Sequence, residues 1–252
     1  MQIEQKNSQE LYNSIFLRKS CRKYDMAPLS KEELTVIYSK IADLKVLYPE
    51  IPLEARIVSP SEVQGIMRVK APHYLVVSGH DKPGENTNAG FLFEQWILWL
   101  LAKGYGSIWL GATSPVNTEA GNKEIITIAF GRVKGKQTRS LADFIRKPIN
   151  EIAQGTDPRL EAARFAPSGV NLQPWYFIVS NSGQGADSTI YIYKKRPGIA
   201  KFLYKFNDLE MGIVLSHLYL ACGNYGIPFE FSTDASGASE PPKGYTYFGK
   251  VR

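Results

Sequence analysis

The sequence is poor in cysteine and histidine. Its 252 residues include two cysteines, Cys21 and Cys222, too few for a disulfide framework. The three histidines have neither the spacing of metal ligands nor a neighbouring cluster of Cys, Asp or Glu. One of them, His217, lies in an apolar helical stretch and is expected to be a core or helix-face residue. We therefore expect free thiols and no metal site.

The chain also lacks a hydrophobic run long enough to cross a membrane. Its longest apolar stretch, residues 91–102, contains Glu94 and Gln95 and falls short of the roughly 20 residues that a spanning helix needs. The first ten residues contain no apolar run typical of a secretory signal. These features favour a cytoplasmic protein with no membrane partner, in which residues 91–102 form part of a buried helix.

No block of one charge dominates the chain, although the net charge is +6 and the isoelectric point is about 9.1. Lysines and arginines are scattered among acidic residues, and no basic run is interleaved with aromatics as in a nucleic-acid groove. We expect no nucleic-acid partner, and small phosphate-bearing ligands explain the local basic clusters better. A hydrophobic content of 44% is enough for a substantial core.

Hydrophobic periodicity predicts a mixed α and β chain. Ser30, with Glu33 three residues later, has the pattern of a helix-initiating capping box. The expected helices are one within 8–24 that ends near the basic motif there (or a helix pair broken at it), 30–44, 91–103, 158–165 and 210–223. The expected strands are 55–58, 73–77, 107–110 (or a loop entry), 125–130, 176–179 and 189–193.

The two halves of the sequence resemble each other. Residues 98–106 overlay residues 218–226 at a constant offset of 120, and residues 56–59 overlay 177–180 at an offset of 121. Two unrelated buried helices would be the alternative explanation. The shared order of elements favours duplication, which predicts an α+β sandwich of two tandem halves, 1–135 and 136–252, packed as a pseudo-dimer in one compact unit.

A basic motif, Arg18-Lys19-Ser20-Cys21-Arg22, follows the first predicted helix. Two guanidinium groups and a hydroxyl within five residues suit phosphate, because arginine contacts phosphate oxygens with two parallel hydrogen bonds. In a helix, Arg18 and Arg22 would share one face. The alternative is a solvated basic helix end.

A second motif, residues 167–175 (Pro-Ser-Gly-Val-Asn-Leu-Gln-Pro-Trp), has proline near both ends. The prolines restrict the backbone around Gly169, while Ser168, Asn171 and Gln173 supply hydroxyl and amide groups. An amide both donates and accepts hydrogen bonds, which suits the polar edge of a planar heterocycle. The alternative is a polar turn before a strand.

Both motifs, together with residues 104–112, resemble the flavin site of the nitroreductase family of FMN-dependent, NAD(P)H-oxidising enzymes. In that family two subunits of a homodimer contribute the two motifs to one site. The resemblance implies that the two halves of this chain imitate that dimer. The corresponding stretches of the opposite halves, 48–55 and 146–152, lack the characteristic residues, so one FMN per chain is expected.

The resemblance implies cofactor-binding residues from four segments. They are Arg18, Lys19, Ser20 and Arg22; Leu110, Gly111 and Ala112; Arg146 and Lys147; and Pro167, Ser168, Gly169, Asn171 and Gln173. The backbone of Gly111 and Ala112 would approach the flavin N5. No catalytic side chain is expected, because the flavin performs the chemistry.

The function implied is an NAD(P)H-dependent FMN oxidoreductase that reduces a nitroaromatic, a quinone or a similar small-molecule acceptor, as a monomer or weak homo-oligomer. A flavin storage or sensor protein without turnover, and an interaction module that has lost both sites, remain alternatives. Loops 60–70 and 183–188, expected to face the acceptor, match no known motif, so the sequence does not predict which acceptor is used or whether NADH or NADPH is the donor.

Overall fold

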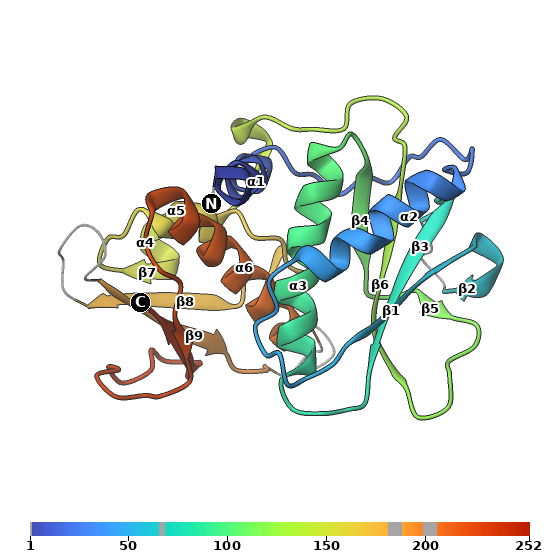
Figure 1. The fold of residues 1–252 in the computed structure, drawn as a ribbon. Coiled ribbons are helices and arrows are strands. Elements are labelled where there is room, and N and C mark those ends of the chain that lie inside the picture. Colours follow the sequence, from blue (N-terminus) through green and yellow to red (C-terminus); the bar gives the residue numbers. More distant parts are fainter. Residues whose placement is uncertain (1, 66–68, 181–187, 199–205) are drawn as a thin grey trace.

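Two β-sheets flank a pair of long helices, α3 and α6 (Figure 1). The computed structural model describes residues 2–65, 69–180, 188–198 and 206–252. The helices are α1 (Gln2–Ile15), α2 (Lys31–Ser39), α3 (Glu85–Ala102), α4 (Ile149–Ile152), α5 (Arg159–Arg164) and α6 (Asn207–Tyr225), with short 3-10 turns at Lys40–Asp43, Pro60–Glu62, Leu141–Asp143 and Gly169–Asn171. The strands are β1 (Glu54–Val58), β2 (Val63–Gln64), β3 (His73–Gly79), β4 (Gly106–Leu110), β5 (Ser114–Pro115), β6 (Lys123–Gly131), β7 (Ala153–Gln154), β8 (Trp175–Ser180), β9 (Thr189–Lys195), β10 (Phe231–Ser232) and β11 (Tyr245–Val251).

The two larger sheets have related topologies. The first has the antiparallel order β1-β3-β6-β4. The second has the order β10-β11-β9-β8-β7, antiparallel except for the parallel pair β7 and β8. If β1, β3, β4 and β6 correspond in chain order to β8, β9, β10 and β11, the four strands are arranged identically. The match agrees with an internal duplication, which stays a prediction.

Helices α3 and α6 pack against each other at two glycines. A Cβ atom on Gly90 would lie 1.9 Å from the carbonyl oxygen of Leu209, and one on Gly212 would lie 2.0 Å from that of Thr87. Leu209 stands three residues before Gly212, and Thr87 stands three residues before Gly90. The two contacts are therefore reciprocal, as they are at a two-fold interface. The absence of side chains lets the backbones approach closely, and the surrounding α3 and α6 residues belong to the largest buried cluster.

Most predicted elements are confirmed. Ser30 caps α2 in a capping box with Glu33, and all six predicted strands are present. The C-terminal tail, whose packing the sequence did not predict, contributes β11 to the second sheet by pairing with β9. Helix α3 begins earlier than predicted, at Glu85.

The first helix ends near the basic motif, as predicted, but the expectation that the motif itself is helical is wrong. Helix α1 ends at Ile15, and the basic motif runs extended, with isolated bridges from Arg18 to Thr138, Ser20 to Ser107 and Tyr24 to Val133. Backbone hydrogen bonds to neighbouring segments on both sides replace those that a helix would make, so tertiary context overrides local propensity. Arg18 and Arg22 therefore do not share a helical face.

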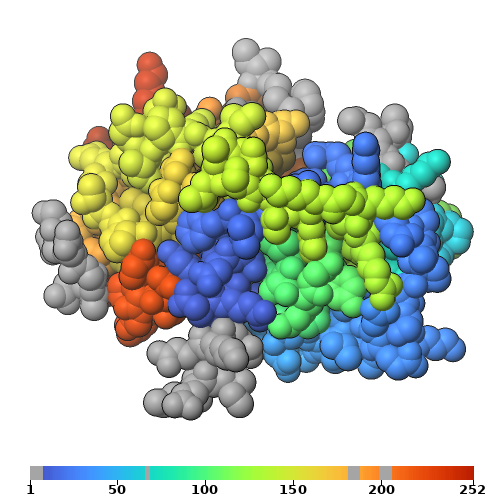
Figure 2. Space-filling view, turned by 90° about the horizontal axis from the view of Figure 1, so that it is seen from above, coloured from blue at the N-terminus to red at the C-terminus, as the bar shows by residue number. Residues whose placement is uncertain are grey.

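The chain after β6 connects the two halves over the surface. In Figure 2 this segment, coloured yellow-green, crosses from the first half to the second beside α1. It carries Thr138 and Arg139 alongside the basic motif, where the Arg139 backbone N–H donates to the Leu17 carbonyl at 3.0 Å. The predicted boundary between halves, residue 135, lies in this connection.

Within the described ranges, no helix is long and apolar enough to cross a membrane. The same residues contain no group of three or more His, Cys, Asp or Glu side chains that could hold a metal ion.

Candidate functional site

Two adjoining cavities lie between the basic motif and the segment Pro167–Trp175, called here the Pro–Ser turn. They share the lining residues Ser20, Arg22, Pro167, Ser168 and Val170. The basic cavity has a volume of about 680 Å³, and the apolar cavity has a volume of about 630 Å³. Both volumes are typical of small-molecule sites, which span roughly 300 to 1,000 Å³.

Four arginines line the basic cavity, and three of them, Arg18, Arg139 and Arg146, lie close enough to influence one another. Arg18 is 4% exposed, and its carbonyl accepts a hydrogen bond from Nε of Arg139 at 2.7 Å. Burial lowers the pKa of Arg139 to about 10, helped by Arg18. Burial also lowers the pKa of Arg146 to about 10, with Arg139 and Arg18 adding to the effect. Like charges are therefore held together in a partly dehydrated place, where an anion would stabilise them.

Two donors of this cluster are left without partners. Nη1 of Arg18 and Nε of Arg146 are buried and make no hydrogen bond within the described part of the chain. Buried donors of this kind cost free energy unless they are paired. The orphaned guanidinium groups and the excess positive charge both favour an anionic ligand in the basic cavity.

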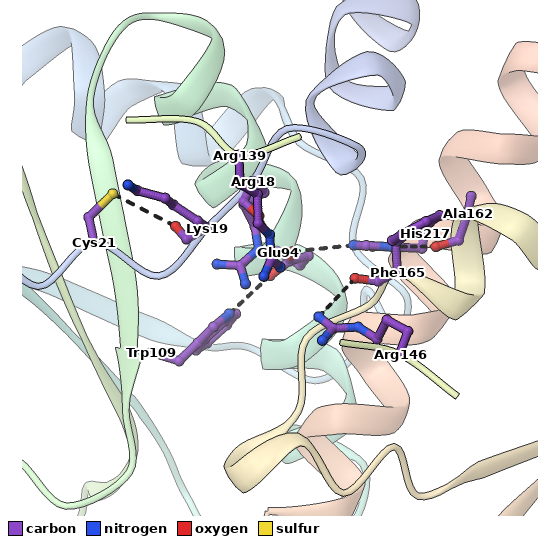
Figure 3. A network of polar contacts seen from close by, with 10 residues as sticks. All are labelled: Arg18, Lys19, Cys21, Glu94, Trp109, Arg139, Arg146, Ala162, Phe165 and His217. Carbon is purple, nitrogen blue, oxygen red and sulfur yellow. Dashed lines mark hydrogen bonds and ion pairs between the residues drawn. The ribbon is translucent and has the colours of Figure 1, made fainter. Parts of the chain in front are cut away.

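Glu94 of α3 links the cluster to the rest of the molecule (Figure 3). It is fully buried, and its Oε1 lies 3.7 Å from Nε of Arg18 and 3.3 Å from Nε2 of His217. Its Oε2 accepts a hydrogen bond from the indole N–H of Trp109 at 2.9 Å. Trp109 also lines the apolar cavity, so this network connects the two cavities through one carboxylate.

His217 contacts the protein on both sides of its ring. Its Nδ1 lies 2.8 Å from the carbonyl oxygen of Ala162, which can only accept, so Nδ1 carries a hydrogen. Its Nε2 faces Glu94. His217 is 1% exposed, which confirms the prediction that it is a core residue.

The Pro–Ser turn is tied to the basic cavity through Asn171. Nη1 of Arg146 donates to Oδ1 of Asn171 at 2.7 Å, and the amide nitrogen of Asn171 donates to the Ile145 carbonyl at 2.8 Å. Val170, Asn171 and Gln173 have positive φ angles of 45°, 59° and 48°. A β-branched residue such as Val170 rarely adopts this conformation, and strained backbone of this kind is common at ligand sites.

All but two of the predicted cofactor-binding residues line one cavity or both. The basic cavity is bordered by Arg18, Lys19, Ser20, Arg22, Arg146, Pro167, Ser168 and Asn171, and the apolar cavity by Ser20, Arg22, Leu110, Gly111, Ala112, Pro167, Ser168 and Gly169. The exceptions are Lys147 and Gln173, which are absent from both sets of described lining residues.

Lys147 and Gln173 instead hold the Pro–Ser turn. The Gln173 side chain is buried, accepts from the Lys147 backbone N–H at 2.9 Å and donates to the Asn171 carbonyl at 3.1 Å. Nζ of Lys147 donates to the Leu172 carbonyl at 3.3 Å. Their polar groups are used within the protein, so the geometry does not support direct cofactor contacts from these two residues.

The apolar cavity is formed by the turn after β4 and by the start of α6. A Cβ atom on Gly111 would lie 2.6 Å from the ring of Phe206, so glycine is needed where this ring crosses the turn. Two buried polar atoms in the lining, Oγ1 of Thr113 and Oε2 of Glu210, have no hydrogen-bond partner within the described ranges. They add two unpartnered polar atoms to a mostly apolar lining that also contains Ser20, Arg22 and Ser168.

Sequence reasoning missed several of these residues. Arg139, Glu94, Thr113 and Glu210 were not predicted as site residues, although two of them are acids within apolar helices, a pattern that marks a buried charge with a specific partner. Of the loops expected to face the acceptor, residues 66–68 and 183–187 lie outside the described residues, and Val69 lines the apolar cavity.

The fold is that of the nitroreductases. A crystal structure described as a "putative nitroreductase" from Thermotoga maritima matches with a TM-score of 0.64 and 20% identity, covering 96% of this chain and 92% of that one. A "Putative NADH dehydrogenase/NAD(P)H nitroreductase" from Parabacteroides distasonis has a TM-score of 0.47 and 16% identity, over 58% of this chain and 98% of that one. An "FMN-dependent Nitroreductase" from Clostridium difficile has a TM-score of 0.42 and 16% identity, over 52% and 93%. No curated protein matches the chain.

A protein-family model described as "Putative TM nitroreductase" matches residues 10–222. This match spans most of the 252 residues, and the chain belongs to this family. Membership supports an oxidoreductase of the nitroreductase type.

Proposed function

We propose that the chain is an FMN-dependent oxidoreductase that holds one FMN across the two adjoining cavities. The phosphate occupies the basic cavity, and the ring system occupies the apolar one. The observation that carries this proposal is the pairing of two unpartnered arginine donors at one end with an apolar space at the other, joined by shared residues of both halves.

The residues of the basic cavity fit a phosphate. The free donors on Arg18 and Arg146 are of the type that binds phosphate with charge-assisted hydrogen bonds. Lys19 and Arg139 border the same space. Ser20 and Arg22 line both cavities, which suits them to the hydroxylated chain between the phosphate and the ring.

The residues of the apolar cavity fit a flat heterocycle. Leu110, Gly111 and Ala112 border it from one half, and Pro167, Ser168 and Gly169 border it from the other. When bound, FMN would supply electron transfer from NAD(P)H to an acceptor such as a nitro compound or quinone. Backbone N–H groups of the turn at Gly111 and Ala112 would stabilise negative charge that develops on the ring.

The test is spectroscopic. The purified protein is titrated with FMN, and the complex is then mixed with NADH or NADPH without oxygen. Binding followed by loss of the oxidised flavin absorbance supports the proposed oxidoreductase. Binding without reduction by either donor favours the storage or sensor alternative, and failure to bind FMN contradicts the proposal.

A further inference from the structure

Glu210 has one oxygen engaged by the protein and one left free. It is 2% exposed in the first turn of α6, and its Oε1 accepts a hydrogen bond from the Gly169 backbone N–H at 2.6 Å. Its Oε2 is buried and unpartnered among the described residues. Since the residue lines the apolar cavity, this free oxygen belongs to the wall of the proposed ring site.

The position that the helix crossing relates to Glu210 is used differently. When the two helices are aligned on their crossing glycines, Gly90 and Gly212, and not at the sequence offset of 120, Asn88 stands two residues before Gly90 as Glu210 stands two residues before Gly212. Oδ1 of Asn88 accepts from the backbone N–H groups of Leu47 and Tyr48 at 3.0 and 3.1 Å, and Nδ2 donates to the carbonyls of Tyr48 and Ile51 at 3.1 and 3.0 Å. These bonds hold the stretch that corresponds in sequence to the Pro–Ser turn.

Asn88 and Glu210 differ in how many of their polar atoms the protein uses. Asn88 uses both of its polar atoms to hold a backbone loop that has lost the site motif. Glu210 holds its loop with one atom only, and the second atom serves no described part of the protein. Buried polar atoms are usually paired, as both of those of Asn88 are, and Oε2 of Glu210 differs from an unpaired buried atom such as Oγ of Ser216 because its residue lines a cavity that a ligand can enter.

The environment of Glu210 favours its neutral form. Burial raises the pKa of the carboxyl to about 7, although the Gly169 N–H opposes this shift. The basic-motif segment contributes Arg22, the one other ionisable side chain in the described lining, while β4, β6 and the Pro–Ser turn contribute none. Because Oε1 already accepts a hydrogen bond, the proton of a neutral carboxyl lies on Oε2 and points to a partner outside the protein.

We propose that Glu210 is a recognition residue whose Oε2–H donates a hydrogen bond to an acceptor atom of a planar conjugated molecule in the apolar cavity. This inference rests on the proposed function. The acceptor atom has two possible sources, which share this chemistry: a carbonyl or ring nitrogen of the cofactor, or a quinone or nitro oxygen of the second substrate. Thr113, with its own unpartnered hydroxyl in the same cavity, is the second polar point available to the molecule.

The experiment compares Glu210→Gln with Glu210→Leu in the full chain. Glutamine can keep the bond to Gly169 and still donate from Nε2, whereas leucine can do neither. Circular dichroism and thermal melting first establish that both variants fold, and Glu240→Gln, an exposed acid in the C-terminal tail, is the control. FMN affinity is measured by flavin fluorescence, and 1,4-naphthoquinone affinity by quenching of tryptophan fluorescence, with and without FMN.

Loss of one neutral hydrogen bond should weaken binding about fivefold to tenfold in Glu210→Leu, with wild-type affinity in Glu210→Gln. If FMN is the ligand that weakens, the acceptor atom belongs to the cofactor. If only naphthoquinone weakens, it belongs to the second substrate. Between pH 6 and 8.5, wild-type affinity for that ligand should fall as Glu210 ionises, while the affinity of Glu210→Gln stays level.

Three results would overturn the inference. Glu210→Leu could bind both ligands as tightly as wild type, or a folded Glu210→Gln could lose as much affinity as the leucine variant, which would mean that Glu210 only supports the turn. In both cases FMN binding by the wild type leaves the proposed function standing. A wild-type protein that binds neither FMN nor naphthoquinone would remove both the inference and the proposed function.

Discussion

Arg146 joins the arginine cluster to the Pro–Ser turn, because its side chain donates to Asn171, while its Nε has no partner among the residues that the structure describes. We expect Arg146→Gln to weaken FMN binding by about 10- to 100-fold, the effect of losing one charged hydrogen bond of about 1.5–3 kcal/mol. Riboflavin, which lacks the phosphate, should bind both proteins similarly. Isothermal titration with the two flavins measures the difference.

The comparison with riboflavin decides how Arg146 acts. Equal weakening of FMN and riboflavin would show that the substitution works through the turn and not on the phosphate. Lys243→Gln, which removes an exposed positive charge far along the chain in the C-terminal tail, controls for the general loss of charge and should change neither affinity.

Glu210 should make the stability of the empty protein depend on pH. Burial raises its pKa from the ordinary value of 4.5 to about 7 in the folded state, so the folded state binds more protons than the unfolded state between these values. The free energy of unfolding therefore falls as pH rises from about 4.5 to above 7, by about 3 kcal/mol. Glu210→Gln should be as stable as wild type near pH 4.5 and more stable at pH 8. Urea unfolding at both values measures this, and parallel pH profiles for the two proteins would contradict it.

Glu94 is a buried charge of a different kind, with partners on three sides. Removing it by Glu94→Gln leaves Arg18 without its carboxylate, and breaking a buried ion pair in this way typically costs about 3–5 kcal/mol. Urea unfolding should show this loss. An anion in the basic cavity would replace part of the missing charge, so added phosphate should stabilise the variant more than wild type. A variant as stable as wild type would show that the ion pair contributes little.

Among the helices and strands, the sequence predicted those whose signal lies within the element itself. Hydrophobic periodicity located α3 and α6, and the capping box at Ser30 located α2. The extended form of residues 18–24 could not be predicted this way, because its hydrogen-bond partners, such as Ser107 and Thr138, are distant in sequence. The candidate site has the same limit. Its two motifs could be recognised in the sequence, but the contact of Glu210 with the Pro–Ser turn could not, because its partner Gly169 lies 41 positions earlier.

The crossing of α3 and α6 depends on its two glycines. A methyl group at Gly212 would meet the Thr87 carbonyl oxygen at 2.0 Å, and backbone cannot move aside as a flexible side chain can. We expect Gly212→Ala to lower the free energy of unfolding by about 1–3 kcal/mol or more. Gly223→Ala in the same helix is the matched control, since its methyl group would meet only the side-chain hydroxyl of Ser8; it should be neutral or stabilising by up to about 1 kcal/mol.

Urea unfolding of the two alanine variants tests this packing argument. Equal stabilities for Gly212→Ala and Gly223→Ala would contradict the close approach of the helices. The contact also bears on the predicted duplication, because Gly90 and Gly212 meet each other's helices at equivalent positions. This reciprocity agrees with the two-fold relation that the repeated strand order suggests, but at an offset of 122 between Gly90 and Gly212, two residues from the offset of 120 read from the sequence.

For the whole molecule, the family resemblance and the proposed function together predict that a single chain combines the two motifs that two subunits would otherwise contribute. The basic motif and the turn after β4 come from the first half, and the Pro–Ser turn and α6 come from the second. In the first half, the loop that would form a second Pro–Ser turn is held by Asn88 and carries none of the Asn, Gln and Trp residues of that motif. On the proposed function, the two halves would therefore build one complete site and leave the opposite one incomplete.

This asymmetry predicts one FMN in each chain, retained without a partner. Native mass spectrometry of the FMN-loaded protein, diluted until dimers dissociate, should show the 28.2 kDa chain carrying a single flavin, because each group that lines the cavities belongs to the same chain. Absorbance should give the same one-to-one ratio. Two flavins per chain would mean that the opposite site has survived. One flavin per two chains, or loss of flavin on dilution to the monomer, would mean that a second chain completes the site and that the single-chain pseudo-dimer is wrong.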